Sequence, residues 1–135
     1  MMTPLRSETL PVREDADILL VRQLVRECAT ELGFGVLDRT KLVTAASELG
    51  RNTLIHGGGG TLLLETFVEN DRCGLRLTFE DKGPGIADLE QAMTDGFTTK
   101  GGLGLGLSGS KRLVDEFEVV SRVGEGTHVT ATQWT

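Results

Sequence analysis

The sequence predicts a two-layer α/β sandwich, in which helices cover one face of a mixed, mainly antiparallel β-sheet. Three observations predict it: two long amphipathic segments near the N-terminus, a hairpin-like pair of strand segments after them, and a second such pair at the end of the chain. Because a helix and a sheet each bury an apolar face, this order favours a layer of helices packed on one sheet. A chain of 135 residues has room for one core, so a single domain is expected over residues 1–135.

The N-terminal part predicts an edge strand followed by a helix. Residues 8–13 contain a proline, which lacks the N–H that a central strand needs and therefore suits the edge of a sheet. Residues 14–32 show helical spacing, with a start at Asp15 or Asp17 and an end at Gly33. The expected apolar stripe of this helix contains Leu20, Leu24, Cys28 and Leu32, with Ile18, Val21 and Val25 beside them.

A second helix and a β-hairpin form the middle of the chain. The helix is expected to begin after Asp38 and to end at the four glycines 57–60. Residues 61–69 and 73–81 are strand-like and are joined by an Asn-Asp turn. The second strand should pack one face against the helices through Leu75, Leu77 and Phe79.

Two further helices and two strands are expected in the C-terminal third. A short helix should run from about Ile86 to Met93, and a helix that begins at about Leu107 should carry Leu113, Val114 and Phe117 on one face. The chain then ends in two strands separated by a turn at residues 124–126. The expected order is therefore β-α-α-β-β-α-α-β-β.

Composition and charge narrow the classes of function. The formal net charge of −6 argues against general nucleic-acid binding, which needs a basic surface. Cys28 and Cys73 are isolated and lack zinc-site spacing, so both are expected to be reduced core thiols. No segment has the apolar run of a signal peptide or a membrane span, so a cytoplasmic protein is expected.

A glycine-rich stretch before the predicted helix at Leu107 indicates an anion site. Residues 96–109 contain six glycines, and the charges in residues 96–112 are all positive, on Lys100, Lys111 and Arg112. Free amides and a helix start both attract phosphate. The GxGxxG pattern at Gly104, Gly106 and Gly109 does not support dinucleotide binding, because too little chain follows for a parallel βαβ unit. A Walker A motif is also missing.

Two other motifs carry oxygen groups. Glu48 and Asn52 lie one helical turn apart, where a carboxylate can accept a proton and an amide oxygen can bind a divalent cation. On its own, such a pair is more often a solvated helix face. Asp81 ends a strand and precedes Gly83 and Gly85, which fits either a tight turn or a place where a flat ring approaches the backbone.

Together these motifs resemble those of the GHKL ATPase superfamily, which includes histidine kinases, type II topoisomerases, Hsp90 and anti-sigma-factor serine kinases. The segment ASELGRN is similar to the N box, EDKGPGI to the first glycine box, FTTKGGLGLGL to the lid and second glycine box, and RLVDEFEVVSRVGEGTHV to the C-terminal segment. The resemblance covers the whole chain, is strongest to the small RsbT-type switch kinases, and implies the Bergerat fold.

The resemblance also implies a role for each motif residue. Glu48 would be the general base that activates the attacking hydroxyl, and Asn52 would bind Mg²⁺. Asp81 would recognise the adenine amino group of ATP, and Thr127 would complete the adenine contact. Close to the adenine ring would lie Gly83 and Gly85. Around the phosphates the resemblance places Lys100, Gly102, Gly104 and Gly106.

The function implied is that of a serine/threonine protein kinase that uses Mg·ATP to phosphorylate a STAS-domain antagonist in a bacterial partner-switching pathway of stress or signalling. The alternative is an anti-sigma factor or phosphatase-activating module that sequesters its partner in an ATP-dependent way. A third reading, a degenerate domain without ATP turnover, is disfavoured by the intact Glu48, Asn52 and Asp81. Beside the STAS protein, a phosphatase, a sigma factor or a second copy of the chain are open partners; nucleic acid and membrane are not expected.

Overall fold

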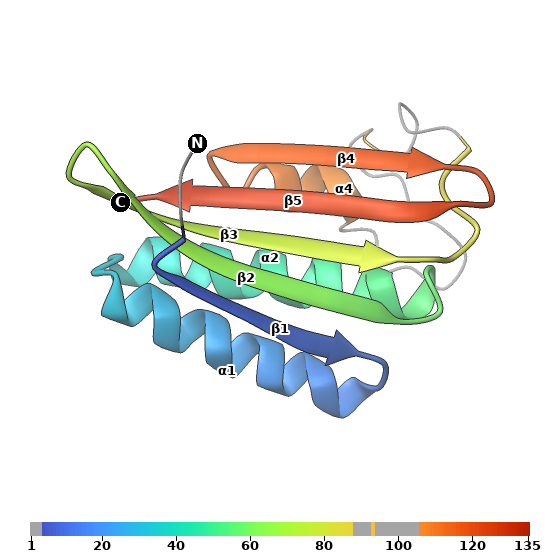
Figure 1. Ribbon diagram of the computed structural model, residues 1–135, viewed down its shortest axis with the longest axis horizontal. Helices are drawn as coiled ribbons and strands as arrows, with labels where there is room; N and C mark the ends of the chain where they lie inside the picture. Colours follow the sequence, from blue (N-terminus) through green and yellow to red (C-terminus); the bar gives the residue numbers. More distant parts are fainter. Residues whose placement is uncertain (1–3, 88–92, 94–105) are drawn as a thin grey trace.

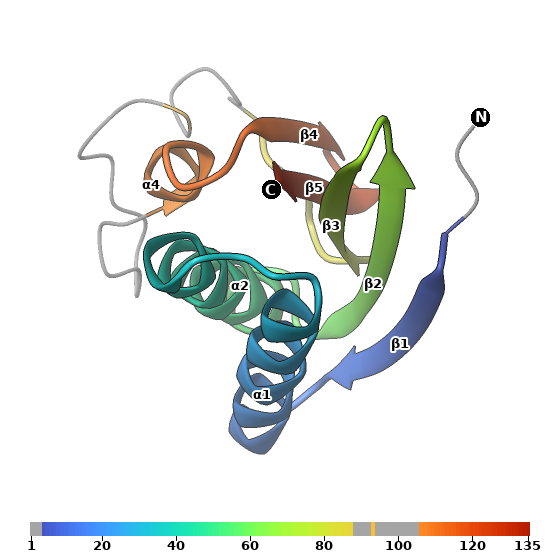
Figure 2. The same cartoon turned by 90° about the vertical axis from the view of Figure 1, so that its left-hand side faces the viewer.

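The computed structural model describes residues 4–87, 93 and 106–135, and in them one sheet lies against a layer of helices (Figure 1). The strands are β1 (Arg6–Val12), β2 (Gly60–Glu69), β3 (Arg72–Asp81), β4 (Glu116–Arg122) and β5 (Gly126–Trp134). The helices within these ranges are α1 (Asp15–Glu31), α2 (Val36–Ile55) and α4 (Gly106–Lys111). Figure 2 shows that the sheet curls around the helices, which all lie on its concave side. The two-layer sandwich is confirmed.

The sheet has the strand order β1-β2-β3-β5-β4, and each of these four pairings is antiparallel. The mainly antiparallel character is therefore confirmed, and no parallel pair occurs among the described strands. β1, which contains Pro11, lies at an edge as expected. The β2–β3 turn places Asn70 and Asp71 at φ 51° and 67°, the left-handed values that a two-residue hairpin turn requires.

Helix α1 begins at Asp15, one of the two predicted starts. Its N-cap is Glu14, and the carboxylate of Asp17 accepts hydrogen bonds from the N–H groups of Arg13 and Glu14. The expected end is confirmed, because Gly33 follows the helix at φ 87°. Leu20 is 51% exposed, so the predicted stripe is wrong at that position. Residues spaced four apart are separated by 400° around a helix of 3.6 residues per turn, so each lies about 40° further round than the one before. A long row at this spacing therefore leaves the buried face. Ile18, Val21, Val25 and Cys28 are buried as expected, together with Ala29.

Removal of the Asp17 carboxylate is expected to destabilise the fold. The substitution Asp17→Ala leaves the two N–H groups before α1 without their acceptor, so the free energy of unfolding should fall by about 1 kcal/mol. Urea denaturation monitored by circular dichroism measures this change. Asp17→Asn retains an acceptor oxygen and should lose much less; equal losses in both variants would contradict a capping role.

Helix α2 begins at Val36, not after Asp38, because Gly35 serves as its N-cap. Asp38 lies in the first turn, where its negative charge interacts favourably with the positive end of the helix dipole. The helix ends at Ile55, just before the glycines, as expected. Gly50 within it has a packing reason, since a Cβ there would lie 2.9 Å from Cδ1 of Ile18 on α1.

The predicted helix through Phe117 is wrong beyond Lys111. α4 ends at Lys111, and Phe117 lies in β4 opposite Ala131. Two hydrogen bonds to β5 hold the chain where it changes from helix to strand. The Asp115 N–H donates to the side chain of Gln133, and the Asp115 carboxylate accepts from the Trp134 N–H. The short helix predicted from about Ile86 to Met93 falls mainly on residues outside the described ranges.

The core fills the space between the sheet and helices α1 and α2. Leu75, Leu77 and Phe79 of β3 are buried in it, which confirms the predicted face. Cys28 is buried there too, and burial raises the pKa of its thiol, which keeps it protonated at neutral pH. Cys73 is only half-buried, so its predicted place in the core is wrong. Among the described helices none is long and apolar enough to cross a membrane.

Candidate active site

The predicted site residues that the structure describes converge on one end of the molecule. Glu48 and Asn52 lie on the C-terminal half of α2, Asp81 is the last residue of β3, and Thr127 is the second residue of β5. In Figure 1 the end of α2, the arrowhead of β3 and the start of β5 all lie at the right-hand side. Lys100, Gly102 and Gly104 lie outside the described residues, and Gly106 is the first residue of α4.

Asp81 is held beside the turn that connects α2 to β2. Its Oδ1 accepts a hydrogen bond of 2.9 Å from the Gly83 N–H, and within the described part of the chain its Oδ2 accepts none. Gly57 lies directly against the carboxylate, since a Cβ on Gly57 would overlap its carboxyl carbon and lie 2.5 Å from Oδ2. The half-buried carboxylate thus has one oriented oxygen and one that can accept a bond from a ligand.

The glycines of the first glycine box are required for packing. A Cβ on Gly83 would lie 2.7 Å from Cα of Gly57. Gly85 has φ 76°, and a Cβ on it would overlap the carbonyl group of Arg122. Both glycines therefore let the loop after β3 lie against its neighbours. The predicted approach of a flat ring to Gly83 and Gly85 stays a prediction.

Glu48 and Asn52 are both half-buried, one turn apart on the same face of α2. The helix continues through Asn52 without a break, and its last turn donates the His56 N–H to the Asn52 carbonyl. The Asn52 side chain offers an amide oxygen, which suits a hard divalent cation. Within the described ranges no group of three or more His, Cys, Asp or Glu side chains could hold a metal ion. The role of Asn52 as a metal ligand stays a prediction.

Ser121 is a residue of this region that the sequence reasoning missed. Asp81, Thr127 and Ser121 occupy one cross-strand row, where β3 and β4 end and β5 begins. The hydroxyl oxygens of Ser121 and Thr127 are 2.8 Å apart. A signal was present in β4, where inward positions Phe117 and Val119 are apolar and Ser121 breaks the pattern.

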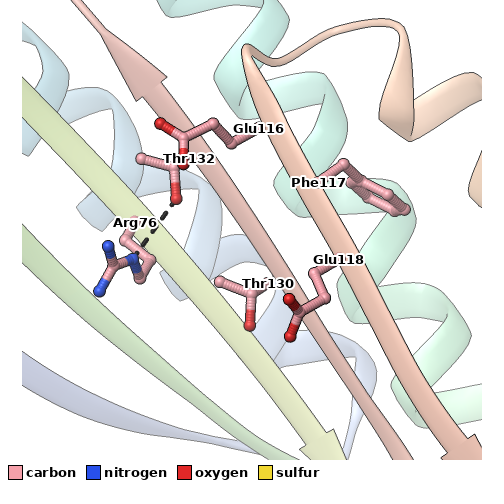
Figure 3. A pocket seen from close by; sticks show the side chains of 6 residues that line it. All are labelled: Arg76, Glu116, Phe117, Glu118, Thr130 and Thr132. Atoms are coloured by element: carbon pink, nitrogen blue, oxygen red, sulfur yellow. Dashed lines mark hydrogen bonds between the residues drawn. The ribbon is translucent and has the colours of Figure 1, made fainter.

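A groove of about 330 Å³ lies away from these residues, on the opposite face of the sheet (Figure 3). It is lined by Arg76, Glu116, Phe117, Glu118, Thr130 and Thr132. Arg76 is engaged within the protein, because its guanidinium lies 4.6 Å from the centre of the Phe67 ring and its Nε donates to Thr132 at 3.4 Å. Of the predicted site residues that the structure describes, none lines this groove. The candidate site is therefore the row formed by Asp81, Thr127 and Ser121 with the adjoining face of α2.

Comparison with known proteins places this arrangement in context. Residues 37–134 match the family model described as histidine kinase-, DNA gyrase B- and HSP90-like ATPase. The chain is 48% identical over 118 residues to the serine/threonine-protein kinase RsbT of Bacillus subtilis, which is 87% of this chain and 89% of that protein. It is 31% identical over 119 residues to an anti-sigma F factor of a Thermoanaerobacter species, covering 84% of this chain and 82% of that protein.

A solved structure supports the fold alone. The crystal structure of the RsbU and RsbW domains of a Mycobacterium tuberculosis protein matches 97% of this chain with a TM-score of 0.65 at 22% sequence identity. The match spans 33% of that longer chain. The order of strands and helices seen here is therefore shared with a solved protein of low sequence identity.

Proposed function

The chain belongs to the histidine kinase-, DNA gyrase B- and HSP90-like ATPase family, and from this premise we infer that it is an ATP-dependent serine/threonine-protein kinase. The observation that carries this function is the similarity to RsbT across most of both chains. The convergence of Glu48, Asn52 and Asp81 at one end of the fold supports it, because a kinase needs a base, a metal ligand and a nucleotide anchor together.

For the transfer step we assign Glu48 as the general base. Its carboxylate would take the proton from the attacking serine or threonine hydroxyl as the oxygen bonds to the γ-phosphorus and the bond to the ADP leaving group breaks. Asn52, one turn further along α2, would hold Mg²⁺ through its amide oxygen. The cation neutralises phosphate charge when it is bound. The two side chains share a helix face, so α2 would position the base relative to the triphosphate.

For nucleotide recognition we assign Asp81 to the adenine amino group. Its Oδ1 is already oriented by the Gly83 N–H, which leaves Oδ2 to accept from the ligand. Thr127, paired with Asp81 across β3 and β5, would complete the adenine contact. The glycines Gly83 and Gly85 would lie near the ring. At the other end of ATP we propose contacts to the phosphates from Lys100, Gly102, Gly104 and Gly106.

The substrate class we propose is a STAS-domain antagonist, phosphorylated in the cytoplasm as part of a partner-switching pathway. The second candidate is an anti-sigma factor that sequesters a sigma factor, and the similarity to anti-sigma F factors favours it. A phosphatase is a further partner of the first function, and self-association into a homodimer is open to both. These functions differ in what the protein does after binding ATP: one transfers phosphate and releases its partner, the other retains it.

Incubation with γ-labelled ATP, Mg²⁺ and purified STAS-domain proteins tests the proposal. Label is expected on one STAS protein and should disappear when its acceptor serine or threonine is changed to alanine. Binding of the same panel and of sigma factors, measured by interferometry with and without ATP, separates the two candidates. A sigma factor held tightly with no label on any STAS protein would replace the first function by the second.

A further inference from the structure

Ser121 joins three segments of the chain at the candidate adenine end of the site. Its Oγ accepts a hydrogen bond of 2.8 Å from the Ile86 N–H, in the loop after β3. It donates to the carbonyl oxygen of Gly126 at 3.1 Å, in β5. It also lies 2.8 Å from the hydroxyl oxygen of Thr127. All of these contacts are partly buried, so water competes for them less than it would at the open surface.

The number of protons in this group decides which way the bond to Thr127 runs. A serine hydroxyl has one proton to donate and two lone pairs with which to accept. Either hydroxyl could donate in the bond between Ser121 and Thr127. With the Ser121 proton directed to the Gly126 carbonyl, which can only accept, Thr127 is the donor of that bond. Ser121 then uses its full capacity, accepting from Ile86 and Thr127. The Thr127 hydroxyl has spent its proton and offers a ligand only lone pairs.

Thr127 therefore stands beside Asp81 as a second hydrogen-bond acceptor. The two residues are directly paired across β3 and β5, and the Asp81 carboxylate is itself an acceptor. Two neighbouring acceptors suit a ligand group with two protons, such as the exocyclic amino group of a 6-aminopurine. A 6-oxopurine presents an acceptor oxygen at the same position and leaves these groups unpaired.

We propose that Ser121 is a positioning residue that makes Thr127 an acceptor and thereby selects 6-aminopurine over 6-oxopurine nucleotides. The proposal rests on the proposed function, because it assumes that Asp81 and Thr127 face the base. Without Ser121, the Thr127 hydroxyl regains a free proton and can donate to a 6-oxo group. The bond to Ile86 is a separate contribution, since its loss affects every nucleotide alike.

The ratio of dissociation constants for ITP and ATP tests this role, because the two bases differ at the 6-position and both lack a 2-amino group. Isothermal titration with Mg²⁺ should show that the parent protein prefers ATP. In Ser121→Ala this preference should fall roughly fivefold, the value of one neutral hydrogen bond. Ser121→Thr retains the hydroxyl, so its preference for ATP over ITP should be close to that of the parent. A preference that is the same in the parent and Ser121→Ala would overturn the proposal.

A second background tests whether Ser121 acts through Thr127. In a Thr127→Val protein, the further change Ser121→Ala should leave the ITP-to-ATP ratio unchanged, while both affinities fall together through Ile86. A change in the ratio there would overturn the proposal. If Ser121→Ala does not fold, as judged by circular dichroism, Ser121→Cys replaces it, because a thiol is a weak donor of similar shape. A parent protein that binds neither nucleotide would instead contradict the proposed function.

Discussion

Replacement of Glu48 by glutamine is expected to lower phosphoryl transfer by roughly 100- to 10,000-fold, the range that a positioned general base contributes. ATP affinity should change much less, because the nucleotide contacts are assigned to Asp81 and Thr127, which lie on strands β3 and β5 and not on α2. Glutamine keeps the size of the side chain and the helix propensity of the position, so α2 should stay intact. Single-turnover transfer from labelled ATP to the STAS substrate, with ATP binding measured separately, gives both quantities.

The matched control lies on the same helix. Asp38→Asn also removes one negative charge from α2 and keeps the side-chain size, but Asp38 is in the first turn, far along the helix from the site. Its transfer rate should stay near that of the parent. Full transfer in the Glu48 variant would remove the base assignment. A loss of ATP binding equal to the loss of transfer would instead make Glu48 a binding residue.

Local signals in the sequence were sufficient for most of the fold. The Asn-Asp turn requires left-handed backbone, and Asn70 and Asp71 adopt it, so the β2–β3 hairpin was predictable from two residues and the alternation beside them. The end of α2 at the glycine run was equally local. The boundary between α4 and β4 was not, because Leu113, Val114 and Phe117 fit a helical face as well as a strand. Long-range bonds from Asp115 to β5 decide it.

In the candidate site, too, residues with a local signal could be predicted and residues that depend on distant contacts could not. Glu48 and Asn52 could be paired from their spacing alone, since a helix places residues four apart on one face. Asp81 could be found from its place at a strand end. Ser121 and Gly57 could not be assigned, because their importance comes from neighbours 35 and 24 residues away, Ile86 and Asp81. Side chains that act through another residue leave only a weak trace in a single sequence, such as the one polar residue in the alternation of β4.

Gly57→Ala is expected to weaken ATP binding nearly as much as Asp81→Ala, by roughly 10- to 100-fold, the value of a hydrogen bond to a charged group. The reason is steric. A Cβ added to Gly57 would overlap the carboxyl carbon of Asp81 and would lie only 2.5 Å from the Cβ of Asp81. The Asp81 side chain must therefore leave its position. The Gly83 N–H would then lose the acceptor that orients Oδ1. Isothermal titration of Mg·ATP into each variant measures the effect.

Two comparisons separate this effect from general loss of stability. Gly35→Ala adds the same methyl group at a position with ordinary φ and no heavy atom within 4 Å of the new Cβ, so it should bind ATP like the parent. In an Asp81→Gly background both the carboxylate and the Cβ that would clash are gone, and Gly57→Ala should add little further loss. If Gly57→Ala binds ATP as the parent does, the carboxylate has room to move without cost. Asp81 would then have to be held by the ligand, with no prior positioning by the turn after α2.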